Sequence, residues 1–190
     1  MTTTLPTKQK LSVVVVYTGE GKGKTSAGIG LVCRSLGHGD VVAFIQFIKA
    51  WKVSEHTFFA DIAPIYGDKF LFHKGGRGFF DAGDMSAKGV SEEEHKASAR
   101  ETFEKALECA VSGAYQLVVC DEINNAVHDG LLALADMERL IDEKHESTNL
   151  CLTGRNFPFE LASKVDILSE MKQIRHHFDD GFIANEGIDY

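Results

Sequence analysis

The 190-residue chain lacks several features that would define its class. Lys and Arg number only 20 against 28 Asp and Glu, a formal net charge of −8. General nucleic-acid binding is disfavoured, because neutralising phosphates requires a basic surface. No apolar run approaches the roughly 20 residues that span a bilayer. The four cysteines show no C-x-x-C pair and no metal-ligand spacing, which suits ordinary thiols in a reducing compartment. Residues 1–10 are polar, so we expect a flexible segment rather than a signal peptide, and a cytoplasmic protein without a nucleic-acid or membrane partner.

The hydrophobic content of 44% is enough for one core, so we expect a single domain over residues 1–190. Short β-branched runs alternate with amphipathic stretches, which predicts an α/β fold. The spacing of the first two runs suits a parallel pair with a right-handed crossover. The predicted strands are 13–18, 41–47, 69–73, 116–120, 149–153 and 165–174, and the predicted helices are 26–36, 58–66, 91–112, 131–144 and 158–164.

A glycine-rich turn, Gly19–Thr25, follows the first strand and precedes the first helix, which we expect to end at the GHG stretch 37–39. Strand, glycine-rich turn and helix are the context of a phosphate-binding loop. Glycines let main-chain N–H groups surround an anion, and the helix N-terminus faces the same anion. Lys24 adds a mobile charge and the Thr25 hydroxyl can bind Mg²⁺. The segment departs from G-x-x-x-x-G-K-[ST], because Thr18 stands at the first glycine position and an extra lysine, Lys22, lies in the turn.

Charged residues follow two later predicted strands. Asp121 and Glu122 come directly after residues 116–120, where a Mg²⁺-directed acid belongs, although a solvated strand end is the alternative. Arg155 follows residues 149–153 and can reach a polyphosphate with its planar donors. Three polar residues in the loop expected after the acid pair fit ligand contact and turn formation equally well: Asn124, Asn125 and His128.

Two other segments invite a functional interpretation. Phe79 and Phe80 lie within the glycine-rich stretch 75–84, where they would meet a flat apolar ligand, a partner subunit or the core. His176 and His177 are adjacent, but neighbouring histidines usually project differently and no third ligand matches them, so we predict no metal there.

Together, several segments resemble the P-loop-type corrinoid (cob(I)alamin) adenosyltransferases, which form the cobalt–carbon bond of adenosylcobalamin from ATP and a reduced corrinoid. The shortened phosphate loop with an extra lysine is a feature of that family. The matching segments are TGEGKGKTS (18–26), GHG (37–39), QFIK (46–49), GF (78–79), DE (121–122), LTGR (152–155) and FDDGFIANEGIDY (178–190).

The resemblance implies a RecA-like P-loop fold, with a mainly parallel central sheet and helices on both faces, in a homodimer. It implies a transferase that moves the 5′-deoxyadenosyl group of ATP to Co(I) of cobalamin or of a precursor such as cob(I)yrinic acid a,c-diamide, releasing triphosphate. Electrons for Co(I) would come from a flavoprotein reductant such as flavodoxin.

The resemblance also assigns residue roles. Thr25 and one of Asp121 and Glu122 would hold Mg²⁺. The family's G-F-T-W element reads GFFD here, so its phenylalanine is kept but Asp81 replaces the tryptophan, which bears on corrinoid preference. The implied catalytic residues are Lys22, Lys24, Thr25 and Glu122. The implied ATP-binding residues are Gly19, Glu20, Gly21, Lys22, Gly23, Lys24, Thr25, Ser26, Arg34 and Arg155, with Phe79 and Phe80 at the corrinoid.

Two other functions fit the same residues. An ATPase or small-molecule kinase would use Asp121 or Glu122 to activate water or an acceptor hydroxyl, and would release ADP. A non-catalytic carrier would bind ATP or corrinoid without turnover. The products formed from ATP separate these functions.

Overall fold

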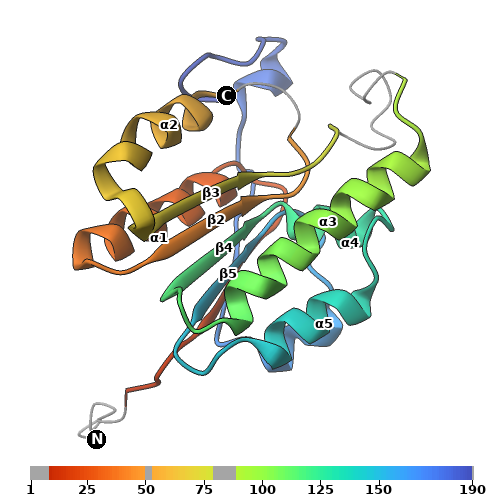
Figure 1. The fold of residues 1–190 in the computed structure, drawn as a ribbon. Helices are drawn as coiled ribbons and strands as arrows, with labels where there is room; N and C mark the ends of the chain where they lie inside the picture. Colours follow the sequence, from red (N-terminus) through yellow and green to blue (C-terminus); the bar gives the residue numbers. More distant parts are fainter. Residues whose placement is uncertain (1–8, 50–52, 79–88, 190) are drawn as a thin grey trace, which may run out of the picture.

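Six strands form one sheet in the computed structural model, which describes residues 9–49, 53–78 and 89–189 (Figure 1). All five strand pairs are parallel. The strand order is β3-β2-β4-β5-β1-β6, so β5 lies between β1 and β4. The bounds are β1 (Val14–Thr18), β2 (Val42–Gln46), β3 (Phe70–Lys74), β4 (Leu117–Asp121), β5 (Asn149–Thr153) and β6 (Ile167–Glu170).

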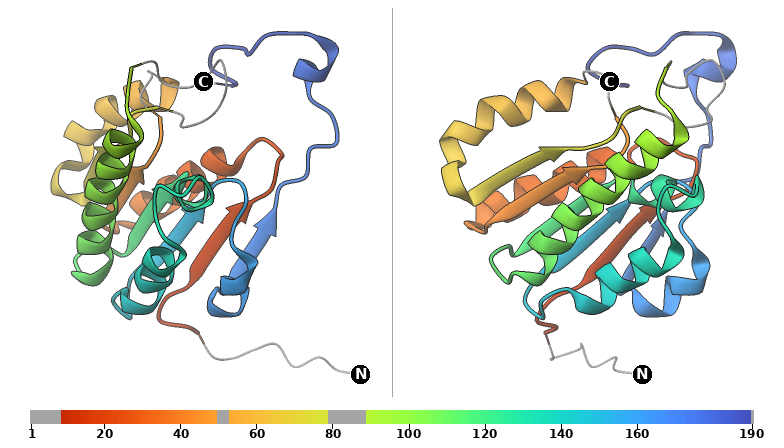
Figure 2. Two further views of the ribbon diagram at one scale, coloured as in Figure 1. Left: turned by 90° about the vertical axis from the view of Figure 1, so that its right-hand side faces the viewer. Right: turned by 45° about the vertical axis from the view of Figure 1, so that its right-hand side comes forward.

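Helices cover both faces of the sheet, as Figure 2 shows. This arrangement confirms the predicted α/β fold with a parallel sheet. None of the helices in the described part of the chain is long and apolar enough to cross a membrane. One face carries α1 (Lys24–His38) and α2 (Ser54–Tyr66), and the other carries α3 (Glu92–Val111), α4 (Ile123–His128) and α5 (Leu134–Glu143). The described residues also include three short 3₁₀ helices: η1 (Gly67–Lys69), η3 (Phe159–Lys164) and η4 (His177–Asp180).

Alternation along β2 shows how the strands serve both layers. Phe44 is fully buried against α1 and α2, whereas Ile45 is fully buried against α3 and α5. Successive side chains of a strand point to opposite faces, so a strand covered on both sides is apolar throughout. This explains why the predicted strands appear as continuous apolar runs rather than as alternating ones.

The first helix ends within the GHG stretch, as predicted: its last residue is His38, and Gly39, with φ of 99°, donates its N–H to the Leu36 carbonyl. Two other expectations are wrong. The predicted loop after β4 is a short helix, α4, which has only six residues and therefore too little length for an apolar repeat to show. The last strand spans four residues instead of ten, because the chain turns over the phosphate loop from Met171 onward.

The core under α2 predicts a local stability difference. Phe59 is fully buried and its ring lies 4.8 to 5.3 Å from those of Phe44, Phe70 and Phe72. We expect Phe59→Ala to lower the free energy of unfolding by about 3–5 kcal/mol, because it removes these contacts and leaves a cavity. The neighbouring Phe58 is 48% exposed, so Phe58→Ala should cost about 1 kcal/mol or less. Urea unfolding would measure both, and equal losses would contradict the assignment.

Candidate functional site

The glycine-rich loop packs directly against the chain that follows β6. An added Cβ atom at Gly19 or at Gly21 would lie 2.6 Å from the Met171 carbonyl oxygen, closer than any side chain tolerates. The Gly21 N–H donates to that oxygen at 2.6 Å. Gly19 and Gly23 also have φ of 94° and 112°, in the left-handed region that favours glycine. Glycine is therefore required here for close approach and for backbone conformation.

Thr18 belongs to the strand and not to the loop. It is the last residue of β1, it is buried, and its hydroxyl accepts a hydrogen bond from the Phe157 N–H at 3.2 Å. The turn of the chain begins one residue later, at Gly19. The departure from the usual glycine spacing is thus a loop shortened by one residue, with a side chain at position 18 that fixes the strand end.

The two loop lysines point to different parts of the molecule. Lys24 folds over the loop and its Nζ donates to the carbonyl oxygens of Gly19 and Gly21 at 2.7 and 2.6 Å. Burial, and next the nearby Arg155, lower the pKa of Lys24, so an anion in the loop would find a cation with little competing solvent. Lys22 instead points to the C-terminal segment, with its Nζ 2.8 Å from Asp189 Oδ1.

The remaining residues predicted to contact phosphate differ in their distance from the loop. Arg155 lies at its edge, where it pairs with Glu20 at 3.3 Å, and Ser26 is exposed in the first turn of α1. Arg34 is ten residues beyond Lys24 on the same helix, about 15 Å of helix rise, so the structure does not bring it to the loop. Phe79 and Phe80 lie outside the described residues.

The buried Asp121 lies at the carboxyl end of β4, level with the ends of the strands beside it. Thr153 at the end of β5 donates its hydroxyl to Asp121 Oδ1 at 2.7 Å, and Gln46 at the end of β2 donates its Nε2 to Oδ2 at 3.1 Å. His56 lies 2.6 Å from the Gln46 Oε1, which fixes the orientation of that amide. Both carboxylate oxygens are thus oriented by neighbouring side chains, as metal-ligating carboxylates commonly are.

Glu122 is strained and incompletely satisfied. Its φ is 64°, which is uncommon for a residue other than glycine, and its N–H donates to the Thr153 hydroxyl at 3.0 Å. Its Oε2 is buried with no hydrogen-bond partner among the described residues. Burial, and next the charge of Asp121, raise the pKa of Glu122 to about 7. A cation beside this carboxylate would give Oε2 a partner and would lower the pKa.

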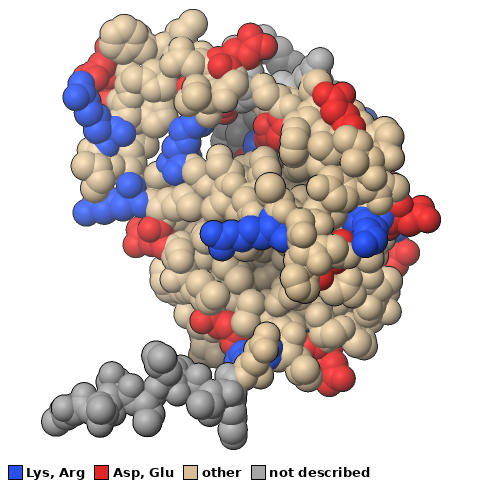
Figure 3. Space-filling model, turned by 90° about the vertical axis from the view of Figure 1, so that its left-hand side faces the viewer, with Lys and Arg blue, Asp and Glu red and all other residues tan. Residues whose placement is uncertain are grey.

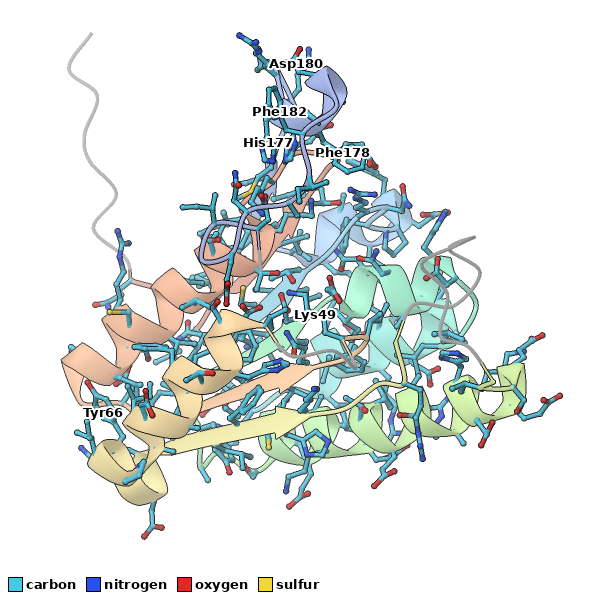
Figure 4. The ribbon with its side chains drawn as sticks, turned by 90° about the horizontal axis from the view of Figure 1, so that it is seen from above. Lys49, Tyr66, His177, Phe178, Asp180 and Phe182 are labelled. Atoms are coloured by element: carbon cyan, nitrogen blue, oxygen red, sulfur yellow. The ribbon has the colours of Figure 1, made fainter. Side chains whose placement is uncertain are left out.

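Lys49 is a cation that faces this acid pair. Its Nζ lies 3.8 Å from Asp121 Oδ2, 3.1 Å from Glu55 Oε1 and 3.5 Å from the Thr25 hydroxyl. Burial opposes its charge, but the nearby acids, chiefly Asp121, outweigh burial and raise the pKa of Lys49. Figure 4, which looks down on the molecule, shows Lys49 near the middle of this edge of the sheet.

The donor set around Thr25 fits Mg²⁺. A hydroxyl and one or two carboxylates are what Mg²⁺ takes from a protein when phosphate oxygens and water supply its other ligands. The orphaned Oε2 of Glu122 supplies an unsatisfied oxygen for it. Within the described ranges, no group of three or more His, Cys, Asp or Glu side chains could hold a metal ion.

The asparagines after the acid pair have structural roles. Asn124 donates its Nδ2 to the Gly154 carbonyl at 3.0 Å, and Asn125 accepts from the Arg155 N–H at 2.9 Å. An added Cβ on Gly154 would lie 2.4 Å from Asn125 Oδ1, so only glycine allows this approach. These bonds place the main chain of Arg155, while the Asn124 Oδ1 is buried with no hydrogen-bond partner among the described residues, so turn formation and ligand contact both fit.

Basic side chains are not concentrated on the face shown in Figure 3, where they are interspersed with acidic and neutral ones. Several residues that contact the site were not predicted from the sequence: Gln46, Lys49, Glu55, His56, Thr153, Met171 and Asp189. Three of them lie in segments that resemble the family: Gln46 and Lys49 are the first and last residues of the QFIK segment, and Asp189 lies in the terminal segment. The resemblance alone assigns neither segment a role.

Comparison with known proteins identifies one family. The model of the family described as "ATP:corrinoid adenosyltransferase BtuR/CobO/CobP" matches residues 10–190. A protein named corrinoid adenosyltransferase from Sinorhizobium sp is 34% identical over 180 residues, covering 94% of this chain and 80% of that protein. A protein of the same name from Escherichia coli strain K12 is 28% identical over 94% of this chain and 85% of its own length. Corrinoid adenosyltransferase CobA from Salmonella typhimurium is 26% identical over 96% and 88%.

The raised pKa of Glu122 predicts a pH dependence of stability. The pKa is about 7 in the folded state against an ordinary 4.5, so the folded state keeps a proton that the unfolded state has released between these values. This contribution is complete below about pH 4.5 and is lost as pH rises through about 7. In urea unfolding without divalent cations, we expect the free energy of unfolding of Glu122→Gln, relative to that of wild type, to increase as pH rises from 5 to 8. Glu160→Gln, at an exposed position on η3, should show no such trend, and a pH-independent difference for Glu122→Gln would contradict the prediction.

Proposed function

The chain belongs to the ATP:corrinoid adenosyltransferase family, and from that premise we propose how its residues divide the reaction. The enzyme transfers the 5′-deoxyadenosyl group of ATP to the Co(I) of a corrinoid. The cobalt–carbon bond forms at C5′ as the carbon–oxygen bond to the triphosphate breaks, and the bonding electrons leave with the triphosphate. The observation that carries the proposal is the glycine loop, whose lysine is folded over it in a partly buried site.

The main task of the loop is to stabilise the charge that develops on the departing triphosphate. Preorganised donors in a site of low polarity are suited to this, because they need not reorient during the reaction. The loop amides and Lys24 would contact the phosphates, and Arg155 would contribute from the loop edge. Lys24 must exchange its bonds with the loop carbonyls for bonds with phosphate oxygens when ATP binds.

We assign the magnesium ligands to Thr25 and to one or both of Asp121 and Glu122. Mg²⁺ bound there would neutralise charge on the triphosphate. Gln46 and Thr153 keep Asp121 oriented, and Lys49 balances the acid pair. No side chain needs to act as a general base, because Co(I) carries no proton to remove.

The described chain that precedes Phe79 is bonded beside this site. The Gly75 N–H donates to the Gln46 carbonyl at 2.8 Å and the Gly78 N–H donates to the Ile48 carbonyl at 2.9 Å. The last described residue before Phe79 is therefore bonded next to Lys49. This position supports a role for both phenylalanines at the corrinoid, where they would exclude water and axial ligands.

We further propose a homodimer in the cytoplasm that receives electrons from a flavoprotein of the flavodoxin type. The sequence contains no motif for a bound redox cofactor, so an external donor has to reduce the cobalt. Family membership supports this proposal.

An anaerobic assay with ATP, Mg²⁺ and chemically reduced cobalamin tests the function. We expect the absorption spectrum to shift as cobalt is alkylated, and triphosphate to form in equal amount. ADP with orthophosphate would identify an ATPase or kinase instead. Stoichiometric binding of ATP or corrinoid without turnover would identify a carrier.

Lys24→Ala tests the assignment of charge stabilisation. Loss of a preorganised donor to the leaving group should cost about 2–4 kcal/mol of transition-state stabilisation, about 30- to 1,000-fold in kcat/KM. The matched control is Lys105→Ala on the exposed side of α3, whose partner is Glu108, and it should retain wild-type activity. A Lys24→Ala enzyme within tenfold of wild type would contradict the assignment.

A further inference from the structure

The C-terminal strap, residues 171–189, returns to the phosphate loop after leaving the sheet. Figures 1 and 2 show it rising from β6, forming η4 and running back beyond the carboxyl ends of the strands. Its beginning is bonded to the loop by main-chain hydrogen bonds, from the Met171 N–H to Thr18 at 2.8 Å and from the Gly21 N–H to Met171 at 2.6 Å. Its far end meets the same loop at Lys22.

Asp189 makes that second attachment. Its side chain is only 8% exposed, and Oδ1 lies 2.8 Å from Lys22 Nζ. The Asp189 carbonyl also accepts from Lys22, at 3.4 Å. Within the strap, the Asn185 N–H donates to Oδ2 at 2.7 Å, and the Asp189 N–H donates back to the Asn185 carbonyl at 2.7 Å. These bonds hold the carboxylate in one orientation toward the loop.

The adjacent histidines lie behind the same carboxylate. The rings of His176 and His177 stack at 4.6 Å, so the expectation that they project differently is wrong. Their Nε2 atoms lie 3.9 and 3.4 Å from Asp189 oxygens. His177 Nε2 also lies 3.1 Å from the Ile183 carbonyl, so the start of η4 contacts the chain that follows this helix. The pair therefore lines the position of Asp189 rather than forming a separate site.

Asp189 is negatively charged over the whole pH range in which enzymes work. The hydrogen bond from Lys22, and next that from Asn185, lower the pKa of Asp189 to about 2. Lys22 stands between Gly21 and Gly23, where the backbone is conformationally free, so a fixed partner restricts both its side chain and the loop. Asp189 accepts with two oxygens, and the third proton of the ammonium remains for another acceptor.

We propose that Asp189 is a positioning residue, which fixes Lys22 and fastens the C-terminal strap to the phosphate loop so that the loop is ordered before the triphosphate binds. The inference rests on the proposed function for the identity of the ligand. It gives the terminal segment, which resembles the family's own, a physical role at the loop. Preorganisation of this kind raises affinity by reducing the ordering that binding must supply.

Asp189→Asn tests the proposal, because it keeps the shape of the side chain and removes its charge. We expect hydrogen exchange of the ligand-free strap to accelerate about tenfold or more, and the Kd for MgATP, measured by calorimetry without corrinoid, to rise about tenfold, the scale of one charge-assisted hydrogen bond. At saturating ATP, kcat should stay within about threefold of wild type, since Asp189 acts on the loop and not on the reacting atoms.

Asp180→Asn is the matched control. Asp180 lies in the same strap and pairs with Arg175 at 2.9 Å, but both side chains are exposed and neither is bonded to the loop. Figure 4 places Asp180 at the outer tip of the strap. Its substitution should change neither exchange nor Kd. Equal effects of the two substitutions, or MgATP binding to Asp189→Asn that is as tight as to wild type or tighter, would overturn the proposal.

A charge exchange separates fastening from phosphate binding. The double substitution Lys22→Asp with Asp189→Lys restores an opposite pair, so slow exchange of the strap should return, while MgATP affinity should stay low because an acid replaces one of the two loop lysines. Continued rapid exchange would overturn the proposal. Both readouts are independent of cobalt chemistry, so a wild-type protein that fails to alkylate corrinoid would refute the proposed function and leave this result intact.

Discussion

The close approach of a main-chain carbonyl to a glycine loop is the constraint on which this molecule depends. Met171 occupies the space where side chains at positions 19 and 21 would lie, and it accepts the Gly21 N–H. This contact joins the first strand, the last strand and the phosphate loop in one bonded unit. It also starts the C-terminal strap in the direction that brings Asp189 back to Lys22. The conformational freedom of glycine is thus balanced by contacts from a segment about 150 residues away in the chain.

The acidic half of the site is fixed by the strand order. With β5 between β1 and β4, Thr153 reaches both Asp121 and the N–H of Glu122, and one hydroxyl orients two consecutive acids. The cationic half comes from the loop on β1 and from Lys49 after β2. Each half would be electrostatically costly without the other, because a buried charge needs a partner or a bound ion. The carboxyl edge of the sheet therefore holds charges of both signs at the place where we propose that the substrate phosphates bind.

Local patterns were enough to predict the strands, the glycine loop and the acids that end β4, because apolar runs and glycine spacing act over a few residues. Long-range partners could not be predicted in the same way. Gln46 and Asp121 are 75 residues apart and Lys22 and Asp189 are 167 apart, and only the fold brings them together. Arg34 is a different case, because only the resemblance placed it among the ATP-binding residues. A helix carries a residue away from its N-terminus by about 1.5 Å per position, so Arg34 needs a contact other than the loop to reach ATP.

The hydrogen bonds that Asp121 and Glu122 already make indicate which chemistry the site can perform. Both oxygens of Asp121 accept hydrogen bonds from side chains. The Oε2 of Glu122 has no hydrogen-bond partner among the described residues, which leaves it free to contact a cation. Asp121 arranged in this way is a poor general base for water or a hydroxyl, because protonation would break the contacts that orient it. It is well suited to holding a cation beside a polyphosphate. A nucleophile without a proton, such as Co(I), places no further demand on these residues, so adenosyl transfer uses the charges of this site as they stand.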